Sequence, residues 1–375
     1  MSGTSYNCIT VSTKALQQNY NYIKSRVGPD VAVMAMVKAD GYGHGMIRAS
    51  KAFADVGCDD FGVAELREAV ILRNSGISGR IFVMLGFEDG EADSIVEHDL
   101  TPVIFDYRSA QFLSNSAINA SKVIDIHIKI DTGMSRLGVK PETLAEFMEE
   151  LERLDGISIG GIMSHFAESD NPESKSTEKG FSSFADGCHA MKNRFKGICH
   201  IANSGAVLNF PSTHCDMVRA GIALYGYNPA GRQRPADESE KGLTPAMSFT
   251  SKVLQVKTVP AGTGVSYGHI FTTDRETRLA VLPVGYEDGY SRILSNSGEV
   301  LLRGQRAPVI GRICMNICMA DVTDIAEVAA GDEVVFLGVQ DQETITADDI
   351  AEEMDSISYE VLCLLGNNNK RAYRE

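Results

Sequence analysis

Positive charge is scarce in this sequence. Its 35 lysine and arginine residues are outnumbered by 50 aspartate and glutamate residues, which gives a formal net charge of −15 at pH 7. A nucleic acid or an anionic membrane surface requires a basic face on its protein partner. We therefore expect neither a nucleic-acid partner nor a membrane partner, and the charge leaves small-molecule substrates open.

Long apolar runs are missing as well. No stretch of the chain approaches the roughly 20 consecutive apolar residues that a membrane-spanning helix needs. Residues 1–6 carry neither the basic segment nor the apolar segment of a secretory signal peptide. These two absences predict a cytoplasmic protein.

The cysteines lack the spacing of a metal site. Eight are present, none in a C-x-x-C pair, and the nearest approach to such a pair is Cys314 and Cys318 in an apolar stretch. Zinc sites are built from closely paired ligands. We expect no bound metal, and instead reduced, mostly buried thiols of the kind found in cytoplasmic proteins.

Two domains are expected from the length of 375 residues. In the first two-thirds of the chain, apolar runs alternate with amphipathic helical patterns, which is typical of a parallel sheet covered by helices. Eight such units in roughly 200 residues favour a closed (β/α)8 barrel, TIM-like in architecture, over an open sheet. We assign this α/β domain to residues 8–228. The predicted strands are Val31–Ala39, Phe61–Ala64, Ile81–Leu85, Thr101–Phe105, Val123–Asp131, Ile157–Phe166, Cys199–Ser204 and Cys215–Gly221. The predicted helices are Met46–Val56, Glu65–Ser75, Ala92–His98, Ser109–Ala117, Pro141–Leu154 and Lys179–Phe195.

The character of the sequence changes after residue 228. Residues 229–240 are polar and rich in proline and glycine, as expected of a linker. Short β-rich segments without long helices between them predict a smaller, mainly-β domain over residues 241–375. Residues 1–7 could join that domain, and Asn7–Val11 could add a strand to either domain. The strands predicted here are Ser248–Val259, Arg278–Pro283, Glu299–Leu302, Gln305–Ile310, Met319–Val322 and Glu333–Leu337.

A lysine lies at the end of the first predicted barrel strand. Lys38 follows the apolar run Val31–Val37 and precedes a glycine-rich turn. Burying a lysine is costly unless its amine is neutralised, paired or used covalently. A Schiff-base lysine fits this position. A lysine that snorkels out of a strand end is the alternative that this segment alone leaves open.

Ionisable side chains also follow other predicted strands. Lys129 and Arg136 follow the fifth strand, His165 follows the sixth, and Arg219 lies at the end of the eighth. The chemistry of a (β/α)8 barrel collects at the carboxyl ends of its strands. We therefore expect these side chains to surround one site.

The turns after the seventh and eighth strands suggest a ligand. Ser204-Gly205 and Gly221-Ile222 supply a hydroxyl and unhindered backbone N–H groups where barrels often bind phosphate. Most glycine turns only connect elements, but these two lie opposite the lysine of the first strand. Together they point to pyridoxal 5′-phosphate (PLP), which needs an imine-forming amine, a phosphate site and a partner for its pyridine nitrogen.

The segment Val37–Gly45 resembles the PLP-attachment motif of the alanine racemases, a family of fold-type III amino-acid racemases. Further blocks match that family in order, through nearly the whole chain and in both predicted domains. They are Lys129 with Arg136-Leu137-Gly138, Ser164–Ala167, Asn203-Ser204, Arg219–Gly226, Val265–Gly268, Gly311–Met315 and Ser358–Glu360.

The resemblance implies a two-base racemase. Lys38 would bind PLP covalently and serve as one acid/base, and Tyr267 would act on the opposite face. In the family this tyrosine comes from the partner subunit, which implies a homodimer with shared active sites. His165 and Arg219 would link Tyr267 to the cofactor, with Arg219 facing a pyridine nitrogen that stays unprotonated because arginine does not readily give up a proton. On the residues alone, an exposed hairpin tyrosine, a core histidine and a structural arginine are the alternatives.

The resemblance also implies contacts to cofactor and substrate. Arg136 would bind the cofactor phenolate and the substrate carboxylate, aided by the backbone of Met315 from the partner subunit. Lys129 matches a lysine that is carbamylated by CO2 in some family members, and we hypothesise the same modification here. The implied phosphate contacts, with Asn203 beside them, are Tyr42, Ser204, Gly221, Ile222 and Tyr359.

Three departures from the family leave the substrate range open. Asn316 replaces the usual aspartate, the tail after Tyr359 lacks the usual Val-Pro-Arg ending, and Cys8–Val11 is an atypical first strand. The leading interpretation is interconversion of L- and D-alanine, which supplies D-alanine for peptidoglycan. A serine or broad-specificity racemase and a non-catalytic PLP-binding protein are the alternatives. A basic amino-acid decarboxylase would show a glycine-rich phosphate loop and a catalytic cysteine in other places.

Overall fold

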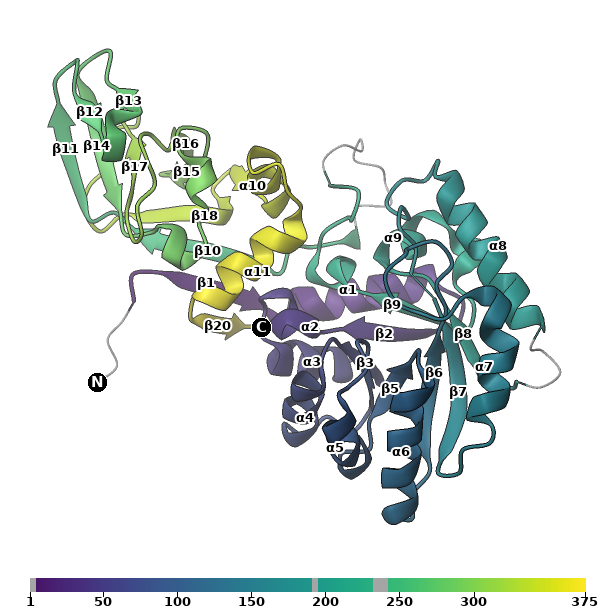
Figure 1. Cartoon of the computed structure of the whole chain (residues 1–375). Coiled ribbons are helices and arrows are strands. Elements are labelled where there is room, and N and C mark those ends of the chain that lie inside the picture. The colour runs from purple at the N-terminus through teal and green to yellow at the C-terminus, as the bar shows by residue number, and fades with distance from the viewer. Residues whose placement is uncertain (1–4, 191–194, 232–241) are drawn as a thin grey trace.

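The computed structural model describes residues 5–190, 195–231 and 242–375. Most of the predicted linker 229–240 lies outside the described residues, and so does part of the predicted helix Lys179–Phe195. Figure 1 shows a barrel of strands surrounded by helices, with a smaller β-rich part beside it. The expected fold class, a (β/α)8 barrel followed by a mainly-β domain, is confirmed.

Eight parallel strands form the barrel. They pair in the order β8-β7-β6-β5-β4-β3-β2-β9, and backbone bonds from Arg219 N to Ala202 O (2.8 Å) and from Asp216 N to Cys199 O (3.1 Å) connect the two ends of the row. The strands are β2 (Ala32–Met36), β3 (Asp60–Val63), β4 (Arg80–Val83), β5 (Thr101–Ile104), β6 (Ile124–Lys129), β7 (Ile157–Met163), β8 (Ile198–His200) and β9 (Met217–Ala220).

Helices cover the outside of the barrel (Figure 1). Local capping starts two of them: the Ser12 hydroxyl accepts from Ala15 N (3.1 Å) and the Asp106 carboxylate from Ser109 N (2.8 Å), as N-cap residues do. The helices are α1 (Thr13–Arg26), α2 (Lys38–Tyr42), α3 (Met46–Ala54), α4 (Leu66–Asn74), α5 (Ala92–Glu97), α6 (Tyr107–Asn119), α7 (Leu144–Leu151), α8 (Lys175–Ala190) and α9 (Ser204–Asn209).

The β-rich part contains two main sheets. The larger joins β1 (Cys8–Ser12), β10 (Met247–Lys252), β15 (Glu299–Leu302), β16 (Gln305–Pro308), β18 (Glu333–Gln340), β19 (Glu343–Ile345) and β20 (Arg371–Arg374). The smaller joins β11 (Gln255–Val259), β14 (Thr277–Leu282) and β17 (Cys318–Asp321), beside the short hairpin of β12 (Gly264–Val265) and β13 (Phe271–Thr272). Two helices, α10 (Ala347–Glu353) and α11 (Ser358–Asn368), complete it.

Several sequence predictions need correction. The first barrel strand ends at Met36, so Lys38 opens the following turn instead of ending the strand. The predicted strand Ser248–Val259 is two strands, β10 and β11, which belong to different sheets. The C-terminal part also has two helices, α10 and α11, which lie after the last predicted strand and were not predicted.

The strand expected near the N-terminus lies in the larger sheet of the β-rich part. β1 pairs antiparallel with β10 and parallel with β20, so that Ile9 lies between Phe249 and Arg371. The barrel therefore starts with α1 rather than at residue 8. We infer that residues 8–12 belong to the C-terminal domain and that the chain crosses into the barrel at Thr13.

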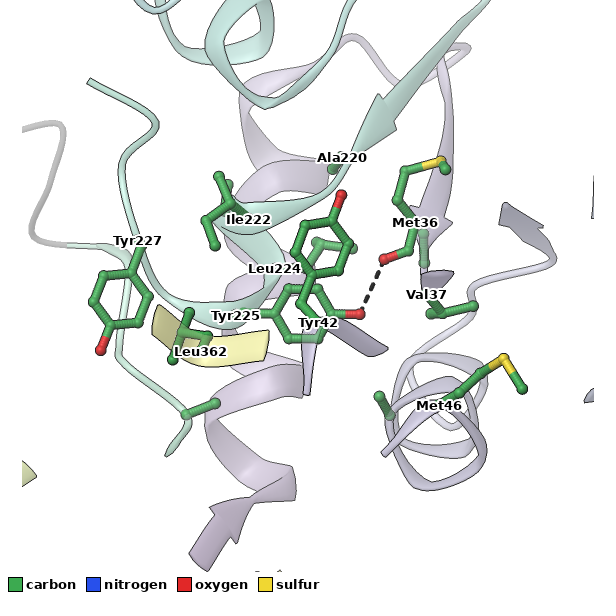
Figure 2. Close-up of a cluster of buried hydrophobic side chains, with 14 of the residues drawn as sticks. Met36, Val37, Tyr42, Met46, Ala220, Ile222, Leu224, Tyr225, Tyr227 and Leu362 are labelled. Carbon is green, nitrogen blue, oxygen red and sulfur yellow. Dashed lines mark hydrogen bonds between the residues drawn. The ribbon is translucent and has the colours of Figure 1, made fainter. Parts of the chain in front are cut away.

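One continuous hydrophobic core extends through both parts. Figure 2 shows the region where the barrel meets α11: the rings of Tyr42 and Tyr225 stack with centroids 4.9 Å apart. The buried Tyr225 hydroxyl donates to Met36 O (2.9 Å), the dashed line in Figure 2. These contacts fix the end of β2 and the turn that follows it. Among the described residues, no helix combines the length and apolarity needed to cross a membrane.

Candidate active site

A cavity of about 310 Å³ opens at the carboxyl ends of the barrel strands. It brings together all the predicted site residues except Tyr267 and Met315. It is lined by Met36, Lys38, Tyr42, Ala64, Met84, Leu85, Lys129, Arg136, Leu137, Met163, His165, Asn203, Ser204, Arg219, Gly221, Ile222 and Tyr359. Segments nearly 200 residues apart within the barrel, and Tyr359 of α11, thus meet at one site.

The cavity is strongly basic. Four of its lining side chains, Lys38, Lys129, Arg136 and Arg219, are cationic types, and none is a carboxylate. Burial lowers the pKa of Lys38, and the charges of Arg136 and Arg219 lower it further. Burial together with Arg219 and Arg136 lowers the pKa of Lys129 to about 7. The cavity therefore favours an anionic ligand and holds amines that are biased towards their neutral, nucleophilic form.

The turn that carries Tyr42 is left-handed. Residues Ala39, Asp40, Gly41 and Tyr42 have φ values of 52°, 51°, 65° and 52°, followed by Gly43 at 81°. For residues other than glycine this conformation costs roughly 1–2 kcal/mol each, so the surrounding structure must hold the turn. Arg371 of β20 forms an ion pair with Asp40 and donates to Gly43 O (2.9 Å). The end of the chain thereby restrains the turn next to Lys38.

Gly221 and Tyr42 approach each other closely on the wall of the cavity. A Cβ atom on Gly221 would lie 2.5 Å from the Tyr42 hydroxyl oxygen. Ser204 Oγ accepts from Gly221 N (2.8 Å), which ties the end of β8 to the turn after β9. Asn203 lines the cavity, but its side-chain oxygen caps α9 by accepting from Ala206 N (3.1 Å).

Arg219 contacts two histidines, His165 in the cavity lining and His200 in β8. Its guanidinium donates to the carbonyl oxygens of Ser164 (2.6 Å) and His200 (2.9 Å). It also lies 3.3 Å from His165 Nδ1 and 3.2 Å from His200 Nδ1. Because arginine only donates, both Nδ1 atoms accept. Burial and the Arg219 charge hold the pKa of both imidazoles well below the usual range, so both rings stay neutral.

The same logic extends to a third histidine. His200 Nε2 lies 2.7 Å from His127 Nδ1. Since His200 is neutral and accepts at Nδ1, its proton is on Nε2, and it donates to His127. The proton of His127 is then on Nε2, a buried atom without a hydrogen-bond partner among the described residues. Sequence reasoning missed His127 and His200, although each is a polar residue with an apolar neighbour before it in a barrel strand.

Asp131 holds the loop that presents Arg136. Its carboxylate accepts from the backbone N–H groups of Gly133 (3.0 Å), Ser135 (3.0 Å) and Arg136 (3.1 Å). Burial opposes ionisation of Asp131, but these hydrogen bonds prevail and hold its pKa below the usual range. Backbone bonds between Val139 and residues Lys129 and Asp131 close the base of the loop. Asp131 is a third residue that the sequence did not single out.

Tyr267 and Met315 lie on the β-rich part, away from the cavity. Tyr267 is 71% exposed and Met315 is 55% exposed. Ser266, whose hydroxyl donates to Arg312 O (2.6 Å), fixes the turn before Tyr267. Asn316 donates to Glu287 Oε2 (2.9 Å) at the surface. Within one chain, these residues do not meet Lys38.

Comparison with known proteins gives a consistent result. Residues 11–229 match the family model for the alanine racemase N-terminal domain, and residues 246–373 match the model for its C-terminal domain. The alanine racemase of Syntrophobacter fumaroxidans is 39% identical over 370 residues, which cover 98% of this chain and 97% of that protein.

Solved structures agree with the sequence match. Alanine racemase from a D-cycloserine-producing Streptomyces lavendulae superposes with a TM-score of 0.92 at 34% identity, covering 100% of this chain and 98% of that one. The Bartonella henselae alanine racemase, solved with covalently bound PLP, gives a TM-score of 0.89 at 28% identity and covers 99% and 100% of the two chains. The barrel and the second domain thus match those of a known group of enzymes, and this chain belongs to the alanine racemase family.

Proposed function

We propose that this chain interconverts L-alanine and D-alanine with PLP bound covalently to Lys38. The observation that carries the proposal is the cavity, where the half-buried Lys38 and three further basic side chains line the wall and no carboxylate does so among the described residues, in a chain of the alanine racemase family. The role we propose is supply of D-alanine for peptidoglycan in the cytoplasm.

The residues of the cavity fit this cofactor. PLP carries an anionic phosphate, an aldehyde and a pyridine ring. The basic lining suits the anion, and the lowered pKa of Lys38 favours the neutral amine that reacts with the aldehyde. Gly221 leaves room beside Tyr42 that a larger residue would fill. We propose that the phosphate contacts are Tyr42, Ser204, Gly221, Ile222 and Tyr359, with Asn203 beside them.

When bound, PLP supplies an electron-poor ring system that stabilises negative charge at the substrate Cα after its proton leaves. Arg219 would face the pyridine nitrogen. Burial lowers the pKa of Arg219 to about 10, so the guanidinium remains charged near pH 7 and donates instead of accepting. His165, neutral and hydrogen-bonded to Arg219, would extend this network towards the second base. Arg136 would hold the cofactor phenolate and the substrate carboxylate.

Racemisation needs one base on each face of Cα. We propose that these bases are Lys38 and Tyr267, with Tyr267 and the Met315 backbone supplied by the partner subunit of a homodimer. Their exposure on the β-rich part, away from the cavity of their own chain, supports this arrangement. A protein that works only as a monomer would contradict it.

Lys129 is proposed to react with CO2. Its pKa of about 7 leaves a large neutral fraction at physiological pH. The amine nitrogen attacks the carbon of CO2, a proton is released, and a carbamate carries a negative charge next to Arg136 and Arg219. A high-resolution crystal structure of the holoenzyme that shows an unmodified ammonium would contradict this proposal.

A panel of L-amino acids tests the proposed substrate. L-alanine should be racemised most efficiently, with serine behind it, although a pocket discriminates one small added group by only about 1–3 kcal/mol. Comparable kcat/KM values for alanine and serine would instead favour the serine or broad-specificity racemase. Binding of PLP without turnover of any amino acid would favour a non-catalytic PLP-binding protein.

A further inference from the structure

Glu68 lies outside the cavity lining but contacts the turn that begins at Lys38. It is in the first turn of α4, which follows β3. Its Oε1 accepts from Ala39 N (2.8 Å), and its Oε2 accepts from Ala64 N (2.8 Å) and Glu65 N (3.2 Å). One carboxylate thus connects the carboxyl ends of the neighbouring strands β2 and β3.

The bond to Ala39 restrains the backbone directly after Lys38. Ala39 has φ 52° and ψ 48° and is the first residue of the left-handed turn. Its N–H belongs to the peptide unit whose carbonyl carbon is that of Lys38. A hydrogen bond to this N–H therefore orients the peptide plane from which the Lys38 side chain starts, at a site where the turn itself is strained.

The charge of Glu68 also acts on the Lys38 amine. Apart from burial, the four strongest influences on the pKa of this amine among the described residues are Arg136 and Arg219, which lower it, and Glu68 and Cys363, which raise it. Glu68 is the only carboxylate among them. It opposes the two guanidinium groups without entering the cavity.

We propose that Glu68 is a positioning residue for Lys38, which fixes the peptide plane after the lysine and places one negative charge near its amine. This inference rests on the proposed function, in which Lys38 captures PLP. Among the described residues, no charged side chain forms a hydrogen bond with the Glu68 carboxylate. Its three hydrogen-bond partners are all backbone N–H groups.

Removal of the charge and removal of the hydrogen bond have separate consequences. Without the negative charge, the pKa of the Lys38 amine falls further, so the neutral amine is present at lower pH. Without the bond to Ala39, the amine is held less well, and covalent capture of PLP becomes slower at every pH. Capture forms a C=N bond between the amine and the aldehyde and releases water.

The experiment follows PLP capture by the full-length, cofactor-free protein with stopped-flow absorbance between pH 6 and pH 10. Glu68→Gln keeps one acceptor oxygen but no charge. Glu65→Gln is the matched control, because it removes one charge from the same helix start, where Glu65 is half exposed and paired with Arg67 (2.6 Å). Borohydride reduction and peptide mapping identify the modified lysine.

In Glu68→Gln we expect the pH midpoint of capture to fall, because the carboxylate that raises the pKa of the Lys38 amine is gone. We expect the plateau rate to fall by about threefold to tenfold, as for one lost hydrogen bond. Glu65→Gln should match the wild type in both. Equal midpoints and equal plateau rates in the two glutamine variants would overturn the inference.

Glu68→Asp separates the effect of the charge from the effect of the hydrogen bond to Ala39. It also provides the test if Glu68→Gln does not fold. It keeps the charge but shortens the reach, so the midpoint should stay and the plateau rate should fall. An unchanged rate in Glu68→Asp would overturn the positioning role. Lys38→Ala tests the proposed function separately from the role of Glu68. If Lys38→Ala still captured PLP covalently, Lys38 would not be the lysine that binds the cofactor, and the proposed function would be refuted.

Discussion

The close approach of Gly221 to Tyr42 gives a prediction that can be worked out from the structure. In Gly221→Ala the new Cβ would lie 2.5 Å from the Tyr42 hydroxyl oxygen and 3.2 Å from its ring carbon Cζ. The first distance is about 1 Å shorter than the ~3.5 Å at which non-bonded heavy atoms pack. Tyr42 is buried and stacked on Tyr225, so its ring has little freedom to move away.

We expect Gly221→Ala to destabilise the cofactor-free protein by about 1–3 kcal/mol, the usual cost of overpacking a core. Tyr42→Phe removes the oxygen that clashes and leaves the next contact at 3.2 Å. The double variant should therefore lose clearly less stability than the sum of the two single variants, with a coupling of about 1 kcal/mol or more.

Thermal unfolding followed by circular dichroism measures this cycle in the four cofactor-free proteins. PLP titration of the same set should show weaker binding than the wild type for Gly221→Ala and for Tyr42→Phe, because the first displaces the Tyr42 hydroxyl from the phosphate and the second removes it. Strictly additive losses of stability would refute the reasoning. So would an unchanged melting temperature in Gly221→Ala, since the predicted contact would then be relieved at no cost.

Three further predictions test other parts of the site. In heavy water, Tyr267→Phe should lose α-proton exchange that starts from L-alanine and retain exchange that starts from D-alanine, as followed by NMR; equal losses would contradict the assignment of faces. In CO2-free buffer between about pH 7 and 10.5, Lys129 binds a proton in the unfolded state but not in the folded state, because folding lowers its pKa. The free energy of unfolding of the wild type, relative to that of Lys129→Ala, should therefore rise with pH in this range by at most about 1.4 kcal/mol per pH unit. A difference between the two proteins that does not change with pH in urea unfolding would contradict the lowered pKa. Asp131→Ala should raise KM for alanine more than it lowers kcat, because the loop that presents Arg136 loses three hydrogen bonds; an unchanged KM would show that the loop holds without them.

Much of the barrel and its site could be predicted from the sequence. Apolar strands that end in polar residues indicate where a parallel barrel places its chemistry, and Lys38, Arg136 and Arg219 meet in the cavity as expected. The prediction of eight β/α units depended only on the alternation of apolar runs with helical patterns and on the length of each unit. These features are local in the sequence, and the barrel topology then brings them together.

Other features depend on contacts that no local pattern reveals. The left-handed turn after Lys38 is held by Glu68 and by Arg371, which lie 30 and 333 residues further along the chain. The helix α1 was missed although Ala15, Leu16, Tyr20 and Ile23 bury one face at helical spacing. The break between β10 and β11 marks a change of sheet, which a continuous β-rich run conceals.

Tyr267 had no local pattern that marks it as a catalytic residue, because an exposed hairpin tyrosine fits the same segment. Its motif was recognised by resemblance, and the structure places its exposed side chain on the β-rich part. The chemistry of the pair Lys38 and Tyr267 must therefore be tested in solution, with the assembled protein.

The most direct test of the account is α-proton exchange by the purified holoenzyme in heavy water. With L-alanine as substrate, NMR should show loss of the α-proton signal together with formation of D-alanine, and both should be abolished in Lys38→Ala. A protein that binds PLP at Lys38 but leaves the α-proton of alanine unexchanged would contradict the central claim that this cavity is a racemase active site.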